Sequence, residues 1–271
     1  MAKISFLKMH GIGNDFIVIP DFESRVPAIS PEQARLWCDR RFGVGADQIL
    51  WLRPAQGTAA DARMEIINAD GSIAEMCGNG IRAAGIYLFD HGPRSAQPKY
   101  RIETLAGILS VEVRDRSVTV NMGAPVLGGG FSGSGEELDL GVEKVRFFEV
   151  SMGNPHAVIF VDDVSRVALE KLGPLIENHP RFPKRTNVEF VQTQSATEIE
   201  VRVWERGTGV TLACGTGACA SAVAALATSR VSGKVRVTLP GGALNISWKG
   251  GTEPVMMEGP AVEVFRGEIE I

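Results

Sequence analysis

Two cysteines stand where a thiol can take part in proton transfer. Cys77 and Cys214 each open the pattern C-G-x-G-x-x-A, and each precedes a run of small and apolar residues typical of a helix. A thiol just before a helix start lies beside unpaired backbone N–H groups and the positive end of the helix dipole, so its thiolate is stabilised. The same N–H groups form a pocket for a carboxylate. The pattern therefore predicts two reactive thiols, each next to carboxylate-binding backbone.

A symmetric pair of acid–base groups suits one reaction class, the inversion of a carbon atom that is acidified by a carboxylate. One face of the carbon needs a base that removes a proton, and the other face needs an acid that returns one. The reverse reaction exchanges these two roles. The charge that develops on the carboxylate would be stabilised by the N–H donors of a helix start.

The two cysteine motifs belong to a longer internal repeat. Gly13–Ile19 matches Gly153–Ile159, and Arg41-Phe42 matches Arg181-Phe182, in the same order as the cysteines. Beyond these, Asp47 is expected to be the repeat counterpart of Asn187. Ordered matches at a nearly constant offset indicate a duplicated domain. The stretch Asn121–Pro125 and the glycines that follow it are expected to form the boundary between the two copies.

Each copy is expected to hold many strands around one apolar helix, an α+β arrangement. The central helices are predicted at Gly78–Phe89 and Gly215–Thr228. A further helix is predicted from the capping signal Ser30-Pro31-Glu32-Gln33 to about Arg41, and another at Val164–Leu172. Strands are predicted for the apolar or alternating segments Ile4–Met9, Phe16–Pro20, Gln48–Leu52, Arg63–Asn68, Tyr100–Thr104, Ile108–Arg114, Ser117–Asn121, Glu149–Ser151, Ala157–Val161, Val188–Gln192, Ile199–Glu205, Lys234–Leu239, Leu244–Trp248, Val255–Glu258 and Val262–Arg266.

Composition narrows the class of protein. The 271 residues suggest two domains, and 28 Lys and Arg against 32 Asp and Glu leave a net charge of −4. That balance argues against nucleic acid as a partner. No apolar stretch is long enough for a membrane span, and residues 1–6 lack the apolar core of a signal peptide. Four cysteines are too few for a disulfide framework, so a reducing, cytoplasmic location is expected.

The chain resembles the diaminopimelate epimerase family along nearly its whole length. The motifs that carry the resemblance are Lys8–Phe16, Gly45–Gln48, Asn68–Ser72, Met76–Gly80, Met152–His156, Arg185–Val188, Trp204–Gly207 and Ala213–Gly217. The resemblance implies two pseudo-symmetric α+β domains, each a mixed β-sheet wrapped around a central helix. It implies domains at 1–121 plus 262–271 and at 122–261, because the last strand of the family returns to the first domain.

The same resemblance implies an activity and a site. The activity is the interconversion of LL- and meso-diaminopimelate in lysine and peptidoglycan precursor biosynthesis, without a cofactor or a metal. Cys77 and Cys214 would be the catalytic base and acid, and His156 and Glu205 would tune or relay their protons. Diaminopimelate, the small-molecule partner, would be bound by Asn14, Gln48, Asn68, Gly78, Asn79, Asn154, Asn187, Glu205, Arg206, Gly215 and Thr216. Arg206 carries the bidentate charge suited to the distal carboxylate. A homodimer is expected from the frequency of two-fold oligomers.

Other interpretations remain open on the sequence alone. Cys38 and Cys219 are expected to be inert core residues, and His10, His91 and His179 to be structural or exposed. The cysteine motif overlaps a loose dinucleotide fingerprint, but neither copy has the strand–helix–strand context. Zinc is not expected, because no C-x-x-C or H-E-x-x-H spacing occurs.

Three alternative functions are weighed against epimerisation of diaminopimelate. A proline racemase-type enzyme would carry His where this chain has Asn79, and would lack the Glu205-Arg206 pair. A relative of the phenazine-biosynthesis type would have lost the cysteines. A thiol redox protein would form a functional disulfide from Cys77 and Cys214.

Overall fold

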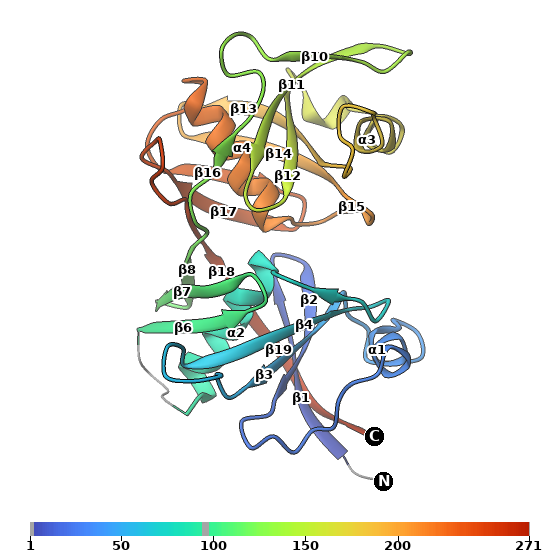
Figure 1. Cartoon of the computed structure of the whole chain (residues 1–271), viewed down its shortest axis with the longest axis vertical. Coiled ribbons are helices and arrows are strands. Elements are labelled where there is room, and N and C mark those ends of the chain that lie inside the picture. The colour runs from blue at the N-terminus through green and yellow to red at the C-terminus, as the bar shows by residue number, and fades with distance from the viewer. Residues whose placement is uncertain (1–2, 94–97, 271) are drawn as a thin grey trace. The chain divides into compact units, whose positions relative to one another are not determined.

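The computed structural model describes residues 3–93 and 98–270 and divides into two compact units. Unit 1 is Met1–Val120 with Gly259–Ile271, and unit 2 is Asn121–Glu258. Residues 1, 2, 94–97 and 271 of the predicted first domain lie outside the described residues. The last strand of the chain belongs to unit 1, where it pairs antiparallel with the first strand (Figure 1).

Unit 1 is a mixed sheet around one helix. Its strands lie in the order β19–β1–β2–β3–β4–β6–β7–β8, and the pairs β2–β3 and β4–β6 are parallel. Helix α2 contacts β1, β2, β3, β6, β7 and β19, so the sheet wraps around it (Figure 1). The bounds are β1 Lys3–Gly11, β2 Asn14–Pro20, α1 Pro31–Cys38, β3 Gln48–Arg53, β4 Ala62–Asn68, β5 Ile73–Ala74, α2 Gly78–His91, β6 Lys99–Thr104, β7 Gly107–Arg114, β8 Ser117–Asn121 and β19 Val262–Glu270.

Unit 2 repeats this topology. Its strands lie in the order β9–β11–β12–β13–β14–β16–β17–β18, with parallel pairs β12–β13 and β14–β16, and helix α4 contacts β11, β12, β13, β14, β16 and β17. The bounds are β9 Val126–Leu127, β10 Glu136–Asp139, β11 Lys144–Ser151, β12 Pro155–Phe160, η1 Val164–Arg166, α3 Leu169–Glu177, β13 Asn187–Ser195, β14 Glu198–Glu205, β15 Gly209–Thr211, α4 Gly215–Ala227, β16 Val235–Leu239, β17 Gly242–Ser247 and β18 Met256–Pro260. The α+β class and the repeat are confirmed.

A small helix covers the outer face of each sheet. Trp37 and Cys38 of α1 pack with Ile17, Ile49 and Trp51 of unit 1. In unit 2, α3 packs in the same way, and Leu172 and Ile176 join a core cluster of strand residues. Each unit therefore has three layers, and the central helix lies on the inner side of its sheet.

Two predictions of local structure are wrong. The helix expected at Val164–Leu172 is a single 3₁₀ turn, Val164–Arg166, followed by α3 from Leu169. Val167 between them has an extended backbone, although Val164, Leu169 and Leu172 all enter one core cluster. The helix expected to reach Arg41 ends at Cys38, while its capping box at Ser30 and Gln33 is confirmed.

The expected match of Asp47 with Asn187 is also wrong, by one residue. Phe16 pairs with Gln48 in unit 1, and its repeat counterpart His156 pairs with Asn187 in unit 2. The register therefore makes Gln48 the counterpart of Asn187. The one-residue drift therefore arises after the second repeat match, between Phe42 and Gln48 in unit 1 and between Phe182 and Asn187 in unit 2.

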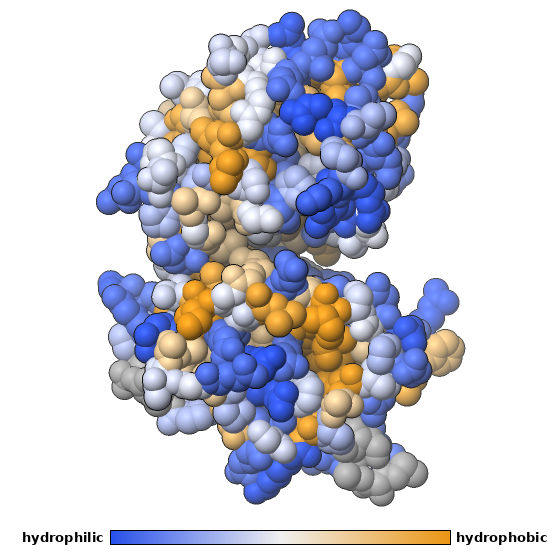
Figure 2. All heavy atoms as spheres, viewed as in Figure 1, coloured by the Kyte–Doolittle hydropathy of each residue, from blue (hydrophilic) through white to orange (hydrophobic). Residues whose placement is uncertain are grey.

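The surface is mixed in character. Figure 2 shows hydrophilic and hydrophobic residues interspersed over the visible face of each unit. Among the described residues, no helix combines the length and the apolar composition that crossing a membrane requires.

Candidate active site

Both motif cysteines cap the central helix of their unit. Cys77 is the N-cap of α2, and its sulfur accepts a hydrogen bond from Gly80 N at 3.3 Å. Cys214 is the N-cap of α4, and its sulfur accepts one from Gly217 N, also at 3.3 Å. Both cysteines have extended backbones, as N-caps do. The helix starts therefore direct backbone donors at both sulfurs.

In unit 1, three polar side chains stand at strand ends, and a fourth, Asn79, belongs to the first turn of α2. Asn14 begins β2 directly after Gly13, whose φ of 91° suits the tight turn from β1. Its Oδ1 lies 3.7 Å from the Cys77 sulfur and 3.2 Å from Asn79 Nδ2, which donates to it. On the neighbouring strands Gln48 pairs with Asn68, and Gln48 Nε2 donates to Asn68 Oδ1 at 2.8 Å.

Gln48 has spare hydrogen-bonding capacity. Its Oε1 is buried and has no hydrogen-bond partner among the residues that the structure describes. A buried carbonyl oxygen without a donor is costly, so this atom is suited to an incoming N–H group.

In unit 2, the corresponding positions carry Asn154, Asn187 and Glu205. Asn154 follows Gly153, which has a φ of 94°, and its Nδ2 donates to Thr216 Oγ1 at 3.2 Å. Glu205 directly follows Trp204, the partner of Val188 in the β13–β14 register, so it stands beside Asn187 as Asn68 stands beside Gln48. The two units thus present matching polar side chains at corresponding strand ends, here called their polar frames.

The predicted residue Arg206 lies beside this frame. Its backbone N donates to Asn187 Oδ1 at 3.0 Å, and its guanidinium is exposed with a bond to Lys184 O at 3.3 Å. Glu177 of α3, which the sequence did not single out, holds the turn after β14 by accepting from Trp204 Nε1 at 2.7 Å and Gly207 N at 2.8 Å.

Cys214 is the more enclosed of the two motif thiols. It is 6% exposed, whereas Cys77 is half-buried. Burial raises the pKa of Cys214 well above its usual value, and the negative charges of Glu205 and Glu189 raise it further. Hydrogen bonds from Thr216 and from Gly217 N act in the opposite direction.

A fully buried His–Glu pair lies next to Cys214. His156 Nδ1 is 2.7 Å from Glu189 Oε1, and both side chains have no exposed surface. His156 was predicted as a site residue, but Glu189 was not. The sequence did contain a signal for Glu189. It lies two residues after the predicted ligand Asn187 on one strand, and therefore on the same face of the sheet.

The other two cysteines, Cys38 and Cys219, are buried. Cys38 is part of the core under α1, where burial raises its pKa to about 11. Cys219 is fully buried within α4. None of Cys38, Cys77, Cys214 and Cys219 forms a disulfide in the part of the chain that the structure describes. Within residues 3–93 and 98–270, no group of three His, Cys, Asp or Glu side chains could hold a metal ion.

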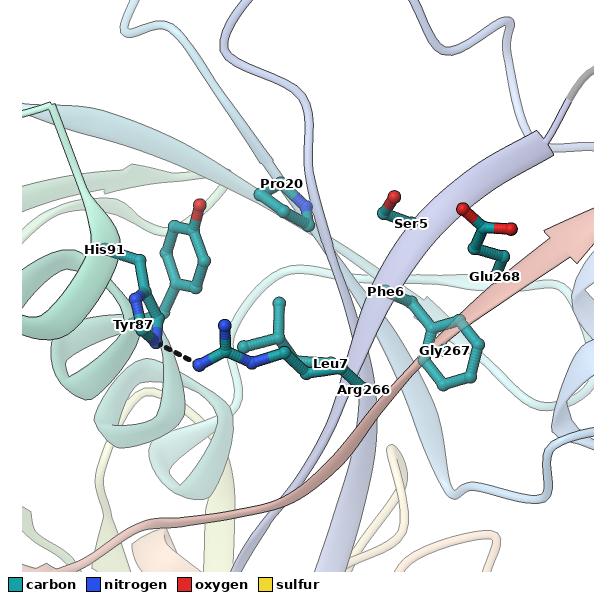
Figure 3. Close-up of a pocket in the computed structure, with 9 residues that line it drawn as sticks. All are labelled: Ser5, Phe6, Leu7, Pro20, Tyr87, His91, Arg266, Gly267 and Glu268. Carbon is teal, nitrogen blue, oxygen red and sulfur yellow. Dashed lines mark hydrogen bonds between the residues drawn. The ribbon is translucent and has the colours of Figure 1, made fainter.

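One pocket of unit 1 is separate from the predicted residues. It measures about 490 Å³ and is lined by Tyr87 and His91 of α2, by Pro20, and by parts of β1 and β19. Figure 3 shows Arg266 reaching from β19 toward His91, whose Nε2 it approaches at 3.0 Å. None of the site residues predicted from the sequence lines this pocket.

Solved structures share the fold at low sequence identity. A phenazine biosynthesis protein of the PhzF family from Bacillus anthracis matches with a TM-score of 0.76 and 17% identity, covering 100% of both chains. A hydroxyproline epimerase from Agrobacterium vitis matches with a TM-score of 0.73 and 18% identity, over 98% of this chain and 92% of its own. Identities this low establish the fold only.

Sequence relatives are much more similar. The diaminopimelate epimerase of Desulfitobacterium hafniense is 47% identical over 97% of both chains. That of Carboxydothermus hydrogenoformans is 48% identical over 98% of this chain and 99% of its own. The family model described as diaminopimelate epimerase matches residues 6–128 and 148–264. The chain therefore belongs to the diaminopimelate epimerase family.

Proposed function

We propose that this chain interconverts LL- and meso-diaminopimelate with two cysteine thiols and without a cofactor. The observation that carries the proposal is the repeated cysteine cap, in which each sulfur lies 3.3 Å from the N–H of the third residue of its helix. The relatives named diaminopimelate epimerase, at 47% and 48% identity, support the choice of substrate. The two units would then be the two catalytic domains of the enzyme.

The proposed chemistry needs one thiolate and one thiol. The thiolate of one cysteine removes the α-proton, and the electron pair of the broken C–H bond spreads into the adjacent carboxylate. The thiol of the other cysteine then delivers its proton to the opposite face of the carbon, which leaves the two protonation states exchanged. Backbone N–H groups at Gly78, Asn79, Gly215 and Thr216 would stabilise the charge on the carboxylate.

The polar frames would bind the two amino-acid ends of the substrate. Asn14, Gln48 and Asn68 from unit 1 and Asn154, Asn187 and Glu205 from unit 2 are the proposed ligands. The unpartnered Oε1 of Gln48 is suited to an ammonium group, and the exposed Arg206 guanidinium is suited to the distal carboxylate. His156 and Glu205 would adjust the proton affinity of Cys214, because a carboxylate close by raises it.

Isotope exchange tests the proposal directly. The reduced protein, with no added pyridoxal phosphate or metal, is incubated with LL-diaminopimelate in D₂O, and deuterium at the α-carbon is measured by mass spectrometry. We expect one deuterium at the inverted centre and formation of the meso isomer. Absence of exchange in folded, reduced protein would overturn the proposal, and exchange of proline instead would favour the racemase alternative.

We infer that the protein acts as a cytoplasmic homodimer. The four cysteines, which form no disulfide among the described residues, support a reducing location. Exposed apolar side chains on β19 support association, since Val262, Val264 and Phe265 are 44%, 56% and 47% exposed. Sedimentation velocity would give the mass, and a monomer at micromolar concentration would contradict the inference.

A further inference from the structure

The buried pair of His156 and Glu189 lies beside the start of α4, which Cys214 caps. Burying two ionisable side chains costs free energy, so a functional reason for the pair is expected. Glu189 Oε1 lies 2.7 Å from His156 Nδ1, whereas Oε2 has no hydrogen-bond partner among the described residues. Burying a carboxylate with one oxygen unsatisfied is strongly unfavourable unless its partner compensates. The carboxylate therefore depends on His156.

The hydrogen bonds around His156 determine where its protons lie. Asn154 Nδ2 donates to Thr216 Oγ1, so Asn154 Oδ1 is the atom left to face His156 Nε2, at 3.0 Å. An amide oxygen only accepts, and Nε2 must carry a proton. Nδ1 meets a carboxylate oxygen at 2.7 Å, which requires a second proton between those two atoms. Glu189 and His156 therefore share a proton.

From His156 onward, every hydrogen bond points toward Cys214. Nε2 donates to Asn154, and Asn154 donates to Thr216 Oγ1. The hydroxyl oxygen of Thr216 is thus occupied as an acceptor, which leaves its proton for the Cys214 sulfur 3.5 Å away. A chain of donors in one direction strengthens each member and favours negative charge on the last acceptor.

Unit 1 shows the opposite arrangement at the same asparagine. Asn14 Nδ2 donates to Asp47 Oδ2 at 2.7 Å, so Asn14 Oδ1 faces the start of α2. It accepts there from Asn79 Nδ2, and the Cys77 thiol also lies in position to donate to it, at 3.7 Å. The amide of Asn14 therefore presents an acceptor where the amide of Asn154 presents a donor.

The two units differ in the residues at the positions of His156 and Glu189, and this difference accounts for the opposite orientation of the two asparagine amides. Phe16 is the repeat counterpart of His156 and is fully buried. Leu50 pairs with Val18 as Glu189 pairs with Val158, so Leu50 is the counterpart of Glu189. Unit 1 thus has an apolar pair where unit 2 has a proton-sharing pair. His156 of unit 2 can donate to the oxygen of Asn154, whereas Phe16, its counterpart in unit 1, cannot donate to Asn14.

We propose that Glu189 is a positioning residue for Cys214, which keeps His156 Nε2 protonated and so turns Asn154 and Thr216 toward the sulfur as donors. The proposal rests on the proposed function in one respect, that Cys214 takes part in catalysis. The charge of Glu189 alone would oppose a thiolate at Cys214, and the proton shared with His156 compensates that charge.

The hydrogen-bond arrangement can be tested without any substrate. The chain has four histidines, so ¹⁵N-histidine labelling gives a short spectrum that a His156→Gln variant assigns. At pH 7.5 we expect His156 to show a protonated Nε2 and a proton at Nδ1 shared with Glu189. In Glu189→Gln the shared proton should disappear while Nε2 stays protonated. A bare Nε2 in the unsubstituted protein would overturn the proposal.

Kinetics of matched variants test the effect on Cys214. Glu189→Leu places the unit 1 residue in unit 2, and we expect kcat to fall about tenfold or more with KM little changed, because Glu189 touches no substrate. Glu189→Gln can still donate to His156 Nδ1 and should recover most of kcat. Glu200→Gln, a partly exposed carboxylate on β14, should have no effect.

The outcomes separate the two proposals. Unchanged kcat in Glu189→Leu, or a Gln variant no more active than the Leu variant, would overturn the role of Glu189. If the unsubstituted protein fails to epimerise diaminopimelate, the proposed function is wrong, and the histidine spectrum still decides the hydrogen bonding. That spectrum also decides the matter if Glu189→Leu does not fold.

Discussion

At the scale of single residues, the two thiols have similar backbones and different surroundings. Each sulfur accepts from a helix N–H at 3.3 Å, but Cys214 is 6% exposed and stands near two carboxylates, while Cys77 is half-buried beside Asn14. A reaction that inverts a carbon uses both thiols in each turnover. Neither can therefore substitute for the other.

Replacing either thiol by a hydroxyl tests this point. Cys77→Ser and Cys214→Ser should each lower epimerase turnover by about 100-fold or more, because a serine hydroxyl is a far weaker acid and general acid–base catalysis contributes at least that much. The measurement is the initial rate of meso-diaminopimelate formation. Cys38→Ser, in the core under α1, serves as the control and should retain its rate once folded. Ordinary activity in either motif variant would contradict the two-thiol mechanism.

The sequence predicts residues that both repeat copies share more readily than residues that occur in one copy alone. The helix-capping positions of Cys77 and Cys214 were predictable, because the repeat marks what the two copies share. Glu189 was not, because its counterpart is Leu50, and a comparison of copies gives no signal where they differ. A glutamate within the apolar run of β13 could still have drawn attention, since its face is buried against α4.

At the scale of elements, the first turn of α4 must leave room for Glu189. A Cβ added to Gly217 would lie 2.7 Å from Glu189 Oε1, an oxygen held in place by His156. In α2 the corresponding Gly80 faces Leu50, where an added Cβ would lie 3.0 Å from a methyl group. The glycine of the motif therefore has a different neighbour in each helix.

The paired alanine variants should separate these two contacts. Gly217→Ala should destabilise the protein by about 1–3 kcal/mol, the usual cost of overpacking, and should lower kcat by displacing Glu189. Gly80→Ala should cost less, because the Leu50 side chain can change rotamer. Thermal unfolding and steady-state kinetics of both variants provide the comparison. A Gly217→Ala protein as stable and active as the Gly80→Ala protein would show that Glu189 is not held rigidly.

Elements were predictable where a local signal defines them. The capping box at Ser30 and the start of both central helices follow from side chains that bond to the nearest backbone. The break at Val167 has no such signal, because the apolar spacing of Val164, Leu169 and Leu172 reports only their common burial. Periodicity identifies a buried face and does not identify a change of helix type.

At the scale of the whole molecule, each unit builds its site frame on its own sheet. The fold class and the duplication could be predicted because they depend on long, ordered patterns in the chain. The register that makes Gln48 the counterpart of Asn187 could not, because strand pairing depends on contacts between segments distant in the sequence.

In unit 1, a cluster of charges joins the hairpin β1–β2 to the segment between α1 and β3. Asp15 accepts from Lys8 Nζ at 2.6 Å and from Arg40 Nη2 at 2.7 Å, and Arg40 also reaches Asp47. Asp47 in turn orients Asn14. Burial opposes ionisation of Asp15, but its hydrogen bonds and the charges of Arg40 and Lys8 outweigh burial and hold its pKa at about 2.

The stability of unit 1 should therefore depend on pH through Asp15. A folded pKa below the ordinary value of 3.8 stabilises the folded state by about 2 kcal/mol above pH 4, and this contribution is lost as the pH falls from about 4 toward 2. Asp15→Asn should lower the free energy of unfolding of unit 1 by up to that amount at pH 7, and the difference should vanish near pH 2. Amide hydrogen exchange, analysed separately for each unit, measures the effect. As a control, Asp162→Asn, at an exposed position, should change the free energy of unfolding of neither unit. If the loss of stability in Asp15→Asn persists unchanged at pH 2, packing rather than ionisation makes Asp15 stabilising.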